Sequence, residues 1–214
     1  MRPEDIETLS FKIIDLEAGE HGFPPDEWSI IRRIVHTSAD FEYIKTIRIH
    51  PSAIRSGTYA IRSGKSVITD TEMAMAGIRK DKLGLYGSSV KCFINNPDVI
   101  KKAGESGTTR AHATVDMAAP LMDGGIFVIG NAPTALLRLI ELVRENKARP
   151  ALVVGLPVGF VKAAESKEAL IGMDIPYISN TGRKGGSNVA AGVINALVLL
   201  AIIDDKLATS HRQG

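Results

Sequence analysis

Apolar residues in the second half of the chain fall in short runs that alternate with longer amphipathic segments. The runs are rich in Val, Ile, Leu and Phe and leave no regular polar face, which is typical of strands buried on both faces of a parallel sheet. We expect five strands, at residues 66–69, 90–94, 126–129, 152–154 and 175–178. Helices are expected near residues 71–78, 97–104, 108–119, 133–146, 162–171 and 187–203.

This alternation predicts an α/β fold, a three-layer sandwich with a mainly parallel, five-stranded, flavodoxin-like sheet. Residues 1–42 predict two N-terminal helices that pack on the main body. The first has an apolar stripe from Ile6 to Leu16, and the second begins at Pro24-Pro25-Asp26-Glu27. Because no repeat or Pro/Ser-rich linker divides the chain, we expect residues 1–214 to form a single α/β domain with residues 1–42 as a helical elaboration.

Ligands of such sheets bind beyond the carboxyl ends of the strands, so the loops there are candidate binding segments. The last of them, TGRKGGSN at residues 181–188, joins a strand to a helix. Free backbone N–H groups and the helix dipole favour a carboxylate or phosphate at such a helix start, and Arg183 and Lys184 would reinforce it. The alternative is that the glycines only form a tight turn. The spacing is neither that of a P-loop nor that of a dinucleotide-binding GxGxxG.

His36 is the candidate proton donor. It lies at the C-terminal end of the second predicted helix, close to Asp40, where the helix dipole favours an imidazolium. Arg33, one turn earlier, could bind a substrate carboxylate; the alternative is that His36 is only a cap or packing residue. His112 stands at a helix start beside Arg110, which favours anion binding over proton transfer.

Other chemistry has no good candidate in the sequence. The five histidines show no HExxH spacing and the single thiol, Cys92, lies in an apolar strand, so we expect neither a metal site nor covalent catalysis. One cysteine cannot form an internal disulfide, which suits a cytoplasmic protein. The longest apolar run, residues 189–203, contains Asn195 and falls short of the roughly 20 residues that span a bilayer, so it predicts a buried helix and no membrane partner.

The charge is balanced overall but uneven along the chain. The formal net charge is +2, yet residues 1–42 have 4 Lys/Arg against 10 Asp/Glu, and residues 43–110 have 12 against 5. The basic segment could face a polyanionic ligand or complement the acidic helices of the same or a neighbouring subunit. Aromatic residues make up only 5%, too few for a base-stacking platform, so a small organic polyanion fits better than nucleic acid.

Five ordered motifs resemble those of the precorrin-8X (or cobalt-precorrin-8) methylmutases of cobalamin biosynthesis. They are RRIVHTSADFEY at 32–43, SVITDTEM at 66–73, TTRAHA at 108–113, IGNAPTAL at 129–136 and NTGRKGGSNVAAGVINAL at 180–197. The resemblance implies an isomerase without a cofactor. It would move a methyl group from C-11 to C-12 of the tetrapyrrole, giving hydrogenobyrinic acid or, with cobalt, cobyrinic acid.

The resemblance also implies roles for particular residues. His36 would be the catalytic acid that protonates the macrocycle, in a homodimer whose site lies near the subunit interface. The implied substrate contacts are Ser10, Arg33, Thr69 and Arg110. The helix start at Gly186 and Ser187 could also hold substrate carboxylates. Two other functions stay open: a non-catalytic tetrapyrrole carrier, which would bind without turnover, and a flavodoxin-like module that binds a nucleotide or phosphate at residues 182–187.

Overall fold

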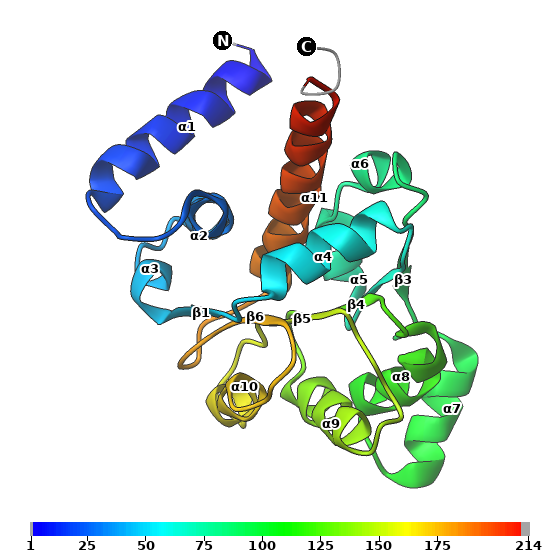
Figure 1. The fold of residues 1–214 in the computed structure, drawn as a ribbon. Coiled ribbons are helices and arrows are strands. Elements are labelled where there is room, and N and C mark those ends of the chain that lie inside the picture. The colour runs from blue at the N-terminus through cyan, green and yellow to red at the C-terminus, as the bar shows by residue number, and fades with distance from the viewer. Residues whose placement is uncertain (1, 211–214) are drawn as a thin grey trace.

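The computed structural model describes residues 2–210, which form one sheet with helices on both faces (Figure 1). The strands are β1 Ile47–Ile49, β2 Val67–Thr69, β3 Val90–Cys92, β4 Ile126–Ile129, β5 Leu152–Gly155 and β6 Tyr177–Asn180. The helices are α1 Pro3–Ala18, α2 Pro25–Ser38, α3 Tyr43–Thr46, α4 Ala53–Arg62, α5 Glu72–Gly77, α6 Lys80–Gly84, α7 Pro97–Ser106, α8 Arg110–Ala118, the 3₁₀ turn η1 Ala119–Leu121, α9 Pro133–Arg144, α10 Ala163–Ile171 and α11 Ser187–Ser210.

The strand order confirms the flavodoxin-like fold. Across the described residues the order is β1-β6-β5-β4-β2-β3, with β1 antiparallel and every other pairing parallel. Counted without β1, the order is 2-1-3-4-5, that of flavodoxin. The sheet has six strands where the sequence predicted five, because β1 is an edge strand of only three residues.

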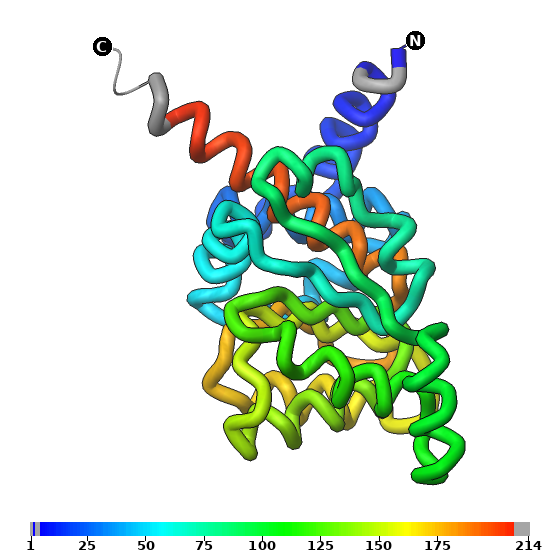
Figure 2. Tube along the Cα trace, turned by 90° about the vertical axis from the view of Figure 1, so that its right-hand side faces the viewer, coloured from blue at the N-terminus to red at the C-terminus, as the bar shows by residue number. Residues whose placement is uncertain are grey.

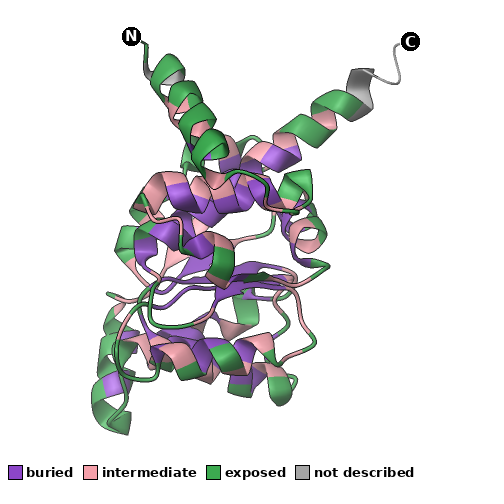
Figure 3. Ribbon diagram, turned by 90° about the vertical axis from the view of Figure 1, so that its left-hand side faces the viewer, coloured by how far each residue is buried: buried purple, intermediate pink, exposed green. Residues whose placement is uncertain are grey.

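Alternate residues of the central strands pack on opposite helical layers. Val128 and Val154 face a core shared with α2, α4 and α11, whereas Phe127 and Val153 face one shared with α8, α9 and α10. Figure 3 shows the strands as a buried band between the two layers. This two-sided burial is why the runs are apolar at every position.

Two element predictions need correction. The last parallel strand is Tyr177–Asn180 instead of 175–178, since Pro176 has no N–H to donate to a ladder; Ser179 and Asn180 therefore belong to the buried strand. Helix α4 was not predicted because Gly57 interrupts its pattern. A Cβ at Gly57 would stand 2.8 Å from Leu152 Cδ2, so glycine lets this helix approach the sheet closely.

The two N-terminal helices behave differently. Helix α2 packs on α11 and buries Ile30, Ile31 and Ile34, as expected. Helix α1 and the C-terminal part of α11 both extend from the same end of the molecule, and the two helices diverge (Figures 2 and 3). Much of the α1 stripe stays exposed, with Leu9 at 46% and Leu16 at 84%, whereas Ile14 is 8% exposed and belongs to the core beside α2. The predicted packing on the body therefore holds for only part of α1.

Helix α11 is longer than its apolar run. It continues to Ser210, and its polar residues Asp204, Asp205 and Lys206 lie beyond the predicted end at residue 203. Residues 187–207 are long and apolar enough to cross a membrane, but 67% of the most apolar stretch is buried inside the protein. That burial is typical of a core helix.

The start of α11 lies directly against the end of β4. A Cβ placed on Gly130 would stand 2.6 Å from the Cα of Ser187, and one on Gly185 would stand 2.2 Å from the Leu156 carbonyl oxygen. Both obstructing atoms belong to the backbone, so a larger residue cannot be accommodated by rotating a side chain. We name the loops at the carboxyl ends of the strands the rim (residues 70–71, 93–96, 130–132, 156–162 and 181–186), and it is tightly packed at Gly130 and Gly185.

We expect Gly130→Ala to lower the free energy of unfolding by about 1–3 kcal/mol, because the added methyl group overpacks this contact. The matched control is Gly104→Ala, in the exposed interior of α7, where a Cβ would meet nothing within 4 Å. Alanine should raise stability there by about 0.5–1 kcal/mol. Urea denaturation of both variants measures the difference, and equal stabilities would contradict the packing argument.

Candidate functional site

Asp70 determines the geometry of the rim at the point where the strand order reverses. This residue follows β2 and is 1% exposed. Its carboxylate accepts hydrogen bonds from the backbone N–H groups of Gly130, Asn131 and Ala132 at 2.9–3.0 Å. Burial raises the pKa of Asp70, and these hydrogen bonds oppose the shift. The loop after β4 is thereby fixed to the end of β2.

Two hydroxyl groups connect this point to α11. The Oγ atoms of Thr71 and Ser187 lie 2.8 Å apart, and Gly186, at φ 140°, donates its N–H to the Leu156 carbonyl at 2.9 Å. Thr69 is fully buried, and its hydroxyl donates to the Thr71 carbonyl at 3.0 Å. Thr69 supports the loop from beneath, and substrate contact there stays a prediction.

Arg110 reaches the same part of the rim from the first position of α8. Its Nη1 lies 3.4 Å from Asn95 Oδ1, and Asn95 donates to Glu72 Oε1 at 2.9 Å. Thr109 caps the helix by accepting the His112 N–H at 3.1 Å. Arg110 is exposed and, within the described part of the chain, its side chain has only this long hydrogen bond, so its guanidinium is available to an anion at the rim.

A buried lysine anchors the loop of residues 181–186 from below. Lys167, on α10, is 0% exposed. Its Nζ donates to Asn180 Oδ1 at 3.1 Å and to the Lys184 carbonyl at 2.6 Å. Burial lowers the pKa of Lys167 to about 8, because taking an ammonium group out of water favours its neutral form.

The two cations expected to strengthen the anion site at the start of α11 are engaged elsewhere. Lys184 forms ion pairs with Asp40 and Glu42, and these carboxylates raise its pKa. Arg183 stacks over the Phe160 ring, 5.4 Å from the centroid. The sequence predicted that Lys184 would strengthen an anion site at the start of α11. In the structure its charge is instead paired with the carboxylates of Asp40 and Glu42, which follow α2.

His36 lies in the last turn of α2 and faces a pocket of about 430 Å³ between α1 and α2. Ser10, on α1, lines the same pocket, and its hydroxyl donates to the Ile6 carbonyl at 2.9 Å. The imidazole of His36 contacts the Phe11 ring edge to face at 5.2 Å and makes no hydrogen bond to any residue in the range 2–210. Asp40, the carboxylate expected beside it, is paired with Lys184.

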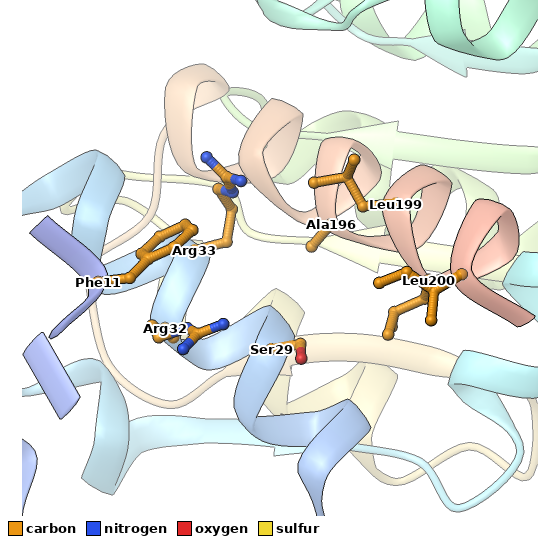
Figure 4. Close-up of a pocket in the computed structure, with 8 residues that line it drawn as sticks. Phe11, Ser29, Arg32, Arg33, Ala196, Leu199 and Leu200 are labelled. Carbon is orange, nitrogen blue, oxygen red and sulfur yellow. The ribbon is translucent and has the colours of Figure 1, made fainter. Parts of the chain in front are cut away.

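Arg33 lies one turn before His36 and binds a carboxylate. Its Nη1 and Nη2 donate to the two oxygens of Glu7 at 3.1 and 3.0 Å. Its guanidinium also stacks on Phe11, 4.7 Å from the ring centroid. Figure 4 shows Phe11 and Arg33 around a small pocket of about 90 Å³ between α1, α2 and α11.

The two parts of the site flank the first turns of α11. Ser187 begins the helix beside Thr71, and Gly192 faces the side chains of Thr37 and Arg33. Five residues of helix correspond to about 7–8 Å. The structure therefore brings Ser10 and His36 to one pocket and Arg33 to the side of α11 at Gly192, whereas Arg110 and Ser187 lie at the rim.

Three residues of this region have no signal in the local sequence. Glu7 and Phe11 contact Arg33 from another helix, and Lys167 is buried within a segment of ordinary helical composition. Only the fold reveals these partners. Within residues 2–210, no three or more His, Cys, Asp or Glu side chains are grouped so as to hold a metal ion.

Comparison with known proteins identifies the family. The sequence model of precorrin-8X methylmutase matches residues 5–200. The chain belongs to the precorrin-8X methylmutase family. It is 47% identical over 201 residues to a cobalt-precorrin-8 methylmutase of Priestia megaterium, covering 94% of this chain and 89% of that protein. Identity to a precorrin-8X methylmutase of Pseudomonas aeruginosa is 37% over 194 residues, 90% of this chain and 93% of that protein.

A solved structure of the precorrin-8X methylmutase family has the same fold. The precorrin-8x methylmutase from Thermus thermophilus superimposes with a TM-score of 0.87 at 44% identity, covering 92% of this chain and 96% of that one. Membership of the precorrin-8X methylmutase family confirms that the chain is an enzyme, an isomerase of cobalamin biosynthesis.

The buried lysine predicts how stability depends on pH. The pKa of Lys167 is about 8 in the folded protein and 10.5 in the unfolded chain. Between these two pH values the unfolded chain therefore binds more protons than the folded one. The free energy of unfolding therefore gains a contribution that rises with pH in this window. Lys167→Met removes this contribution.

We expect the stability of the original protein, relative to that of Lys167→Met, to increase from about pH 8 to about pH 10.5. Urea denaturation of both proteins across this range measures the difference. A difference that stays constant would show that Lys167 is not a buried, titrating ammonium group.

Proposed function

We propose that the protein moves the methyl group from C-11 to C-12 of precorrin-8X or its cobalt form, with His36 as the general acid. The observation that supports this most directly is the position of His36 at a helix C-terminus, facing a pocket without a hydrogen bond to any described residue. The pocket gives a substrate access to the imidazole.

The shift is intramolecular, so bringing two reactants together contributes nothing. Catalysis then depends on protonation and on accommodating the charge that develops in a water-poor pocket. His36 donates a proton to the macrocycle, which makes the neighbouring carbon electron-poor and able to accept the migrating methyl group. Because substrate and product are isomers, the proton returns to the imidazole after migration.

Polar groups around the pocket suit the acetate and propionate carboxylates at the edge of such a substrate. Arg33 binds a carboxylate through two parallel hydrogen bonds in this structure, the geometry that arginine offers to such groups. Ser10 lines the pocket of His36, and Arg110 is exposed at the rim. We assign substrate carboxylates to these three residues. At the start of α11 the Gly186 N–H donates to the Leu156 carbonyl and Ser187 is 7% exposed, so this helix start can act on a carboxylate only through its dipole.

We also propose that two copies of the chain associate through α1 and the end of α11. Apolar side chains of both helices are exposed, among them Ile6 at 52%, Leu9 at 46%, Leu16 at 84%, Ile203 at 52% and Leu207 at 57%. Such a surface is unfavourable in water unless it is covered. The acidic residues 1–42 and basic residues 43–110 provide complementary charges for a second copy.

The activity is tested by mixing the protein anaerobically with cobalt-precorrin-8 and, separately, with precorrin-8X, and following the visible spectrum. Conversion of one or both to the corrin product is the expected result, and the form converted identifies the natural substrate. Tight binding without conversion would favour the carrier, and binding of FMN, NAD or a nucleotide in place of a corrinoid would favour the flavodoxin-like module.

We expect His36→Ala to reduce turnover by about 10²- to 10⁴-fold, the usual contribution of a general acid, while product binding is retained. His50→Ala is the matched control, because His50 lies after β1 beside Tyr177, on another part of the sheet. Full activity in His36→Ala would refute the assignment of this residue.

For the dimer, we expect Leu9→Glu and Leu16→Glu to shift the protein toward monomer, because a charge at an apolar interface is costly. Leu85→Glu, at a side chain 68% exposed outside these helices, should leave the mass unchanged. Light scattering measures the mass. Raised salt should weaken an interface held by charge, whereas a salt-insensitive dimer would indicate an apolar one.

A further inference from the structure

Glu7 and Arg33 form a carboxylate–guanidinium pair with both hydrogen bonds in place, at 3.0 and 3.1 Å. The Arg33 side chain is 13% exposed, whereas that of Glu7 is 45% exposed. Solvent therefore reaches the carboxylate more easily than the guanidinium. The arginine is part of a packed surface, and its partner is accessible.

A second arginine is held near this pair by an asparagine in an apolar helix. Asn195, on α11, accepts the backbone N–H of Arg79 at 2.9 Å and donates to the Gly77 carbonyl at 2.9 Å. Gly77 itself lies against Ala191, where a Cβ would approach to 2.9 Å. Residues 77–79 are thus fixed to α11, which accounts for a polar residue in this apolar run.

Arg33 and Arg79 flank the same turn of α11. Gly192 faces the Arg33 side chain, and Asn195, three residues later, binds the backbone of Arg79. Among residues 2–210, the Arg79 guanidinium has one hydrogen-bond partner, Asp81, at 3.5 Å, which is too long for a strong hydrogen bond.

The carboxylate of Glu7 interacts with the cations on both sides. The hydrogen bond from Arg33 is the largest cause of its lowered pKa, and the charges of Arg33, His36 and Arg79 add to it. Its position is therefore one where a carboxylate is stabilised by several positive groups.

Helix α1 can release this carboxylate at low cost. The helix packs mainly on α2, and its apolar stripe stays largely exposed. A substrate carboxylate can accept the same two hydrogen bonds from Arg33, and the released Glu7 side chain, already 45% exposed, is solvated by water. A rigid polyanion that also binds the rim would compete well for Arg33.

We propose that Arg33 and Arg79 form a carboxylate subsite that Glu7 occupies in this structure and from which a substrate carboxylate displaces it. This inference rests on the proposed function, since it assumes that the corrin precursor binds beside His36. Glu7 then acts as an internal competitor, and Arg79 becomes a binding residue that receives the incoming carboxylate.

The test measures dissociation constants for cobyrinic acid and for the same corrin with its carboxylates amidated. Glu7→Gln keeps the shape but removes the competing charge, so affinity for the acid should rise roughly threefold to tenfold. Arg79→Met should weaken it roughly fivefold. Neither change should alter binding of the amidated corrin by a comparable factor, which a merely structural role would do.

Matched controls are Glu20→Gln, exposed after α1, and Arg149→Met, exposed before the amino end of β5, away from the rim. Weaker binding of the acid in Glu7→Gln would show that Glu7 positions Arg33 and would overturn the proposal. So would a fall in turnover without a change in affinity, which would make Glu7 a partner of His36. If the original protein binds neither corrin, the proposed function fails instead.

Discussion

The close contact between the end of β4 and the start of α11 determines where every other part of the site can lie. The contact depends on Gly130, which leaves room for the backbone of Ser187, and on Asp70, whose three backbone hydrogen bonds offset the cost of burying a carboxylate. With α11 fixed there, its next turns present Gly192 to α2 and Asn195 to residues 77–79. Arg33 and Arg79 therefore both contact α11.

The sequence predicts the central layers well because the physics there is local. A strand buried on both faces must be apolar at every position, so β4 and β5 are recognised from their runs alone. The failures lie where tertiary contacts decide. Strand β1 is a strand through its pairing with β6. Helix α1 has an apolar stripe that is largely exposed to solvent, and the periodicity of a sequence does not reveal whether such a stripe is covered.

The site divides in the same way. His36 could be placed at a helix end from the sequence, because helix ends have local signals. The ion-pair partners of the charged residues around the site could not be placed from the sequence. Lys184 follows a glycine-rich turn and suggests an anion site, yet its charge is satisfied by Asp40, more than a hundred residues earlier. Glu7 reaches Arg33 across two helices. Partners so distant in sequence depend on the topology.

Two of the cations near the site are already paired within the protein. Arg33 and Lys184 hold internal carboxylates, so a polyanion bound here exchanges partners with the protein instead of adding to unpaired cations. Because one carboxylate replaces another, the number of ion pairs stays the same and the affinity depends on geometry. A rigid ring that places several carboxylates correctly can displace the flexible carboxylate side chains of the protein at little cost in conformational entropy. Such an arrangement favours a large, multiply charged substrate over small anions, which gain only one pair for the one that they displace.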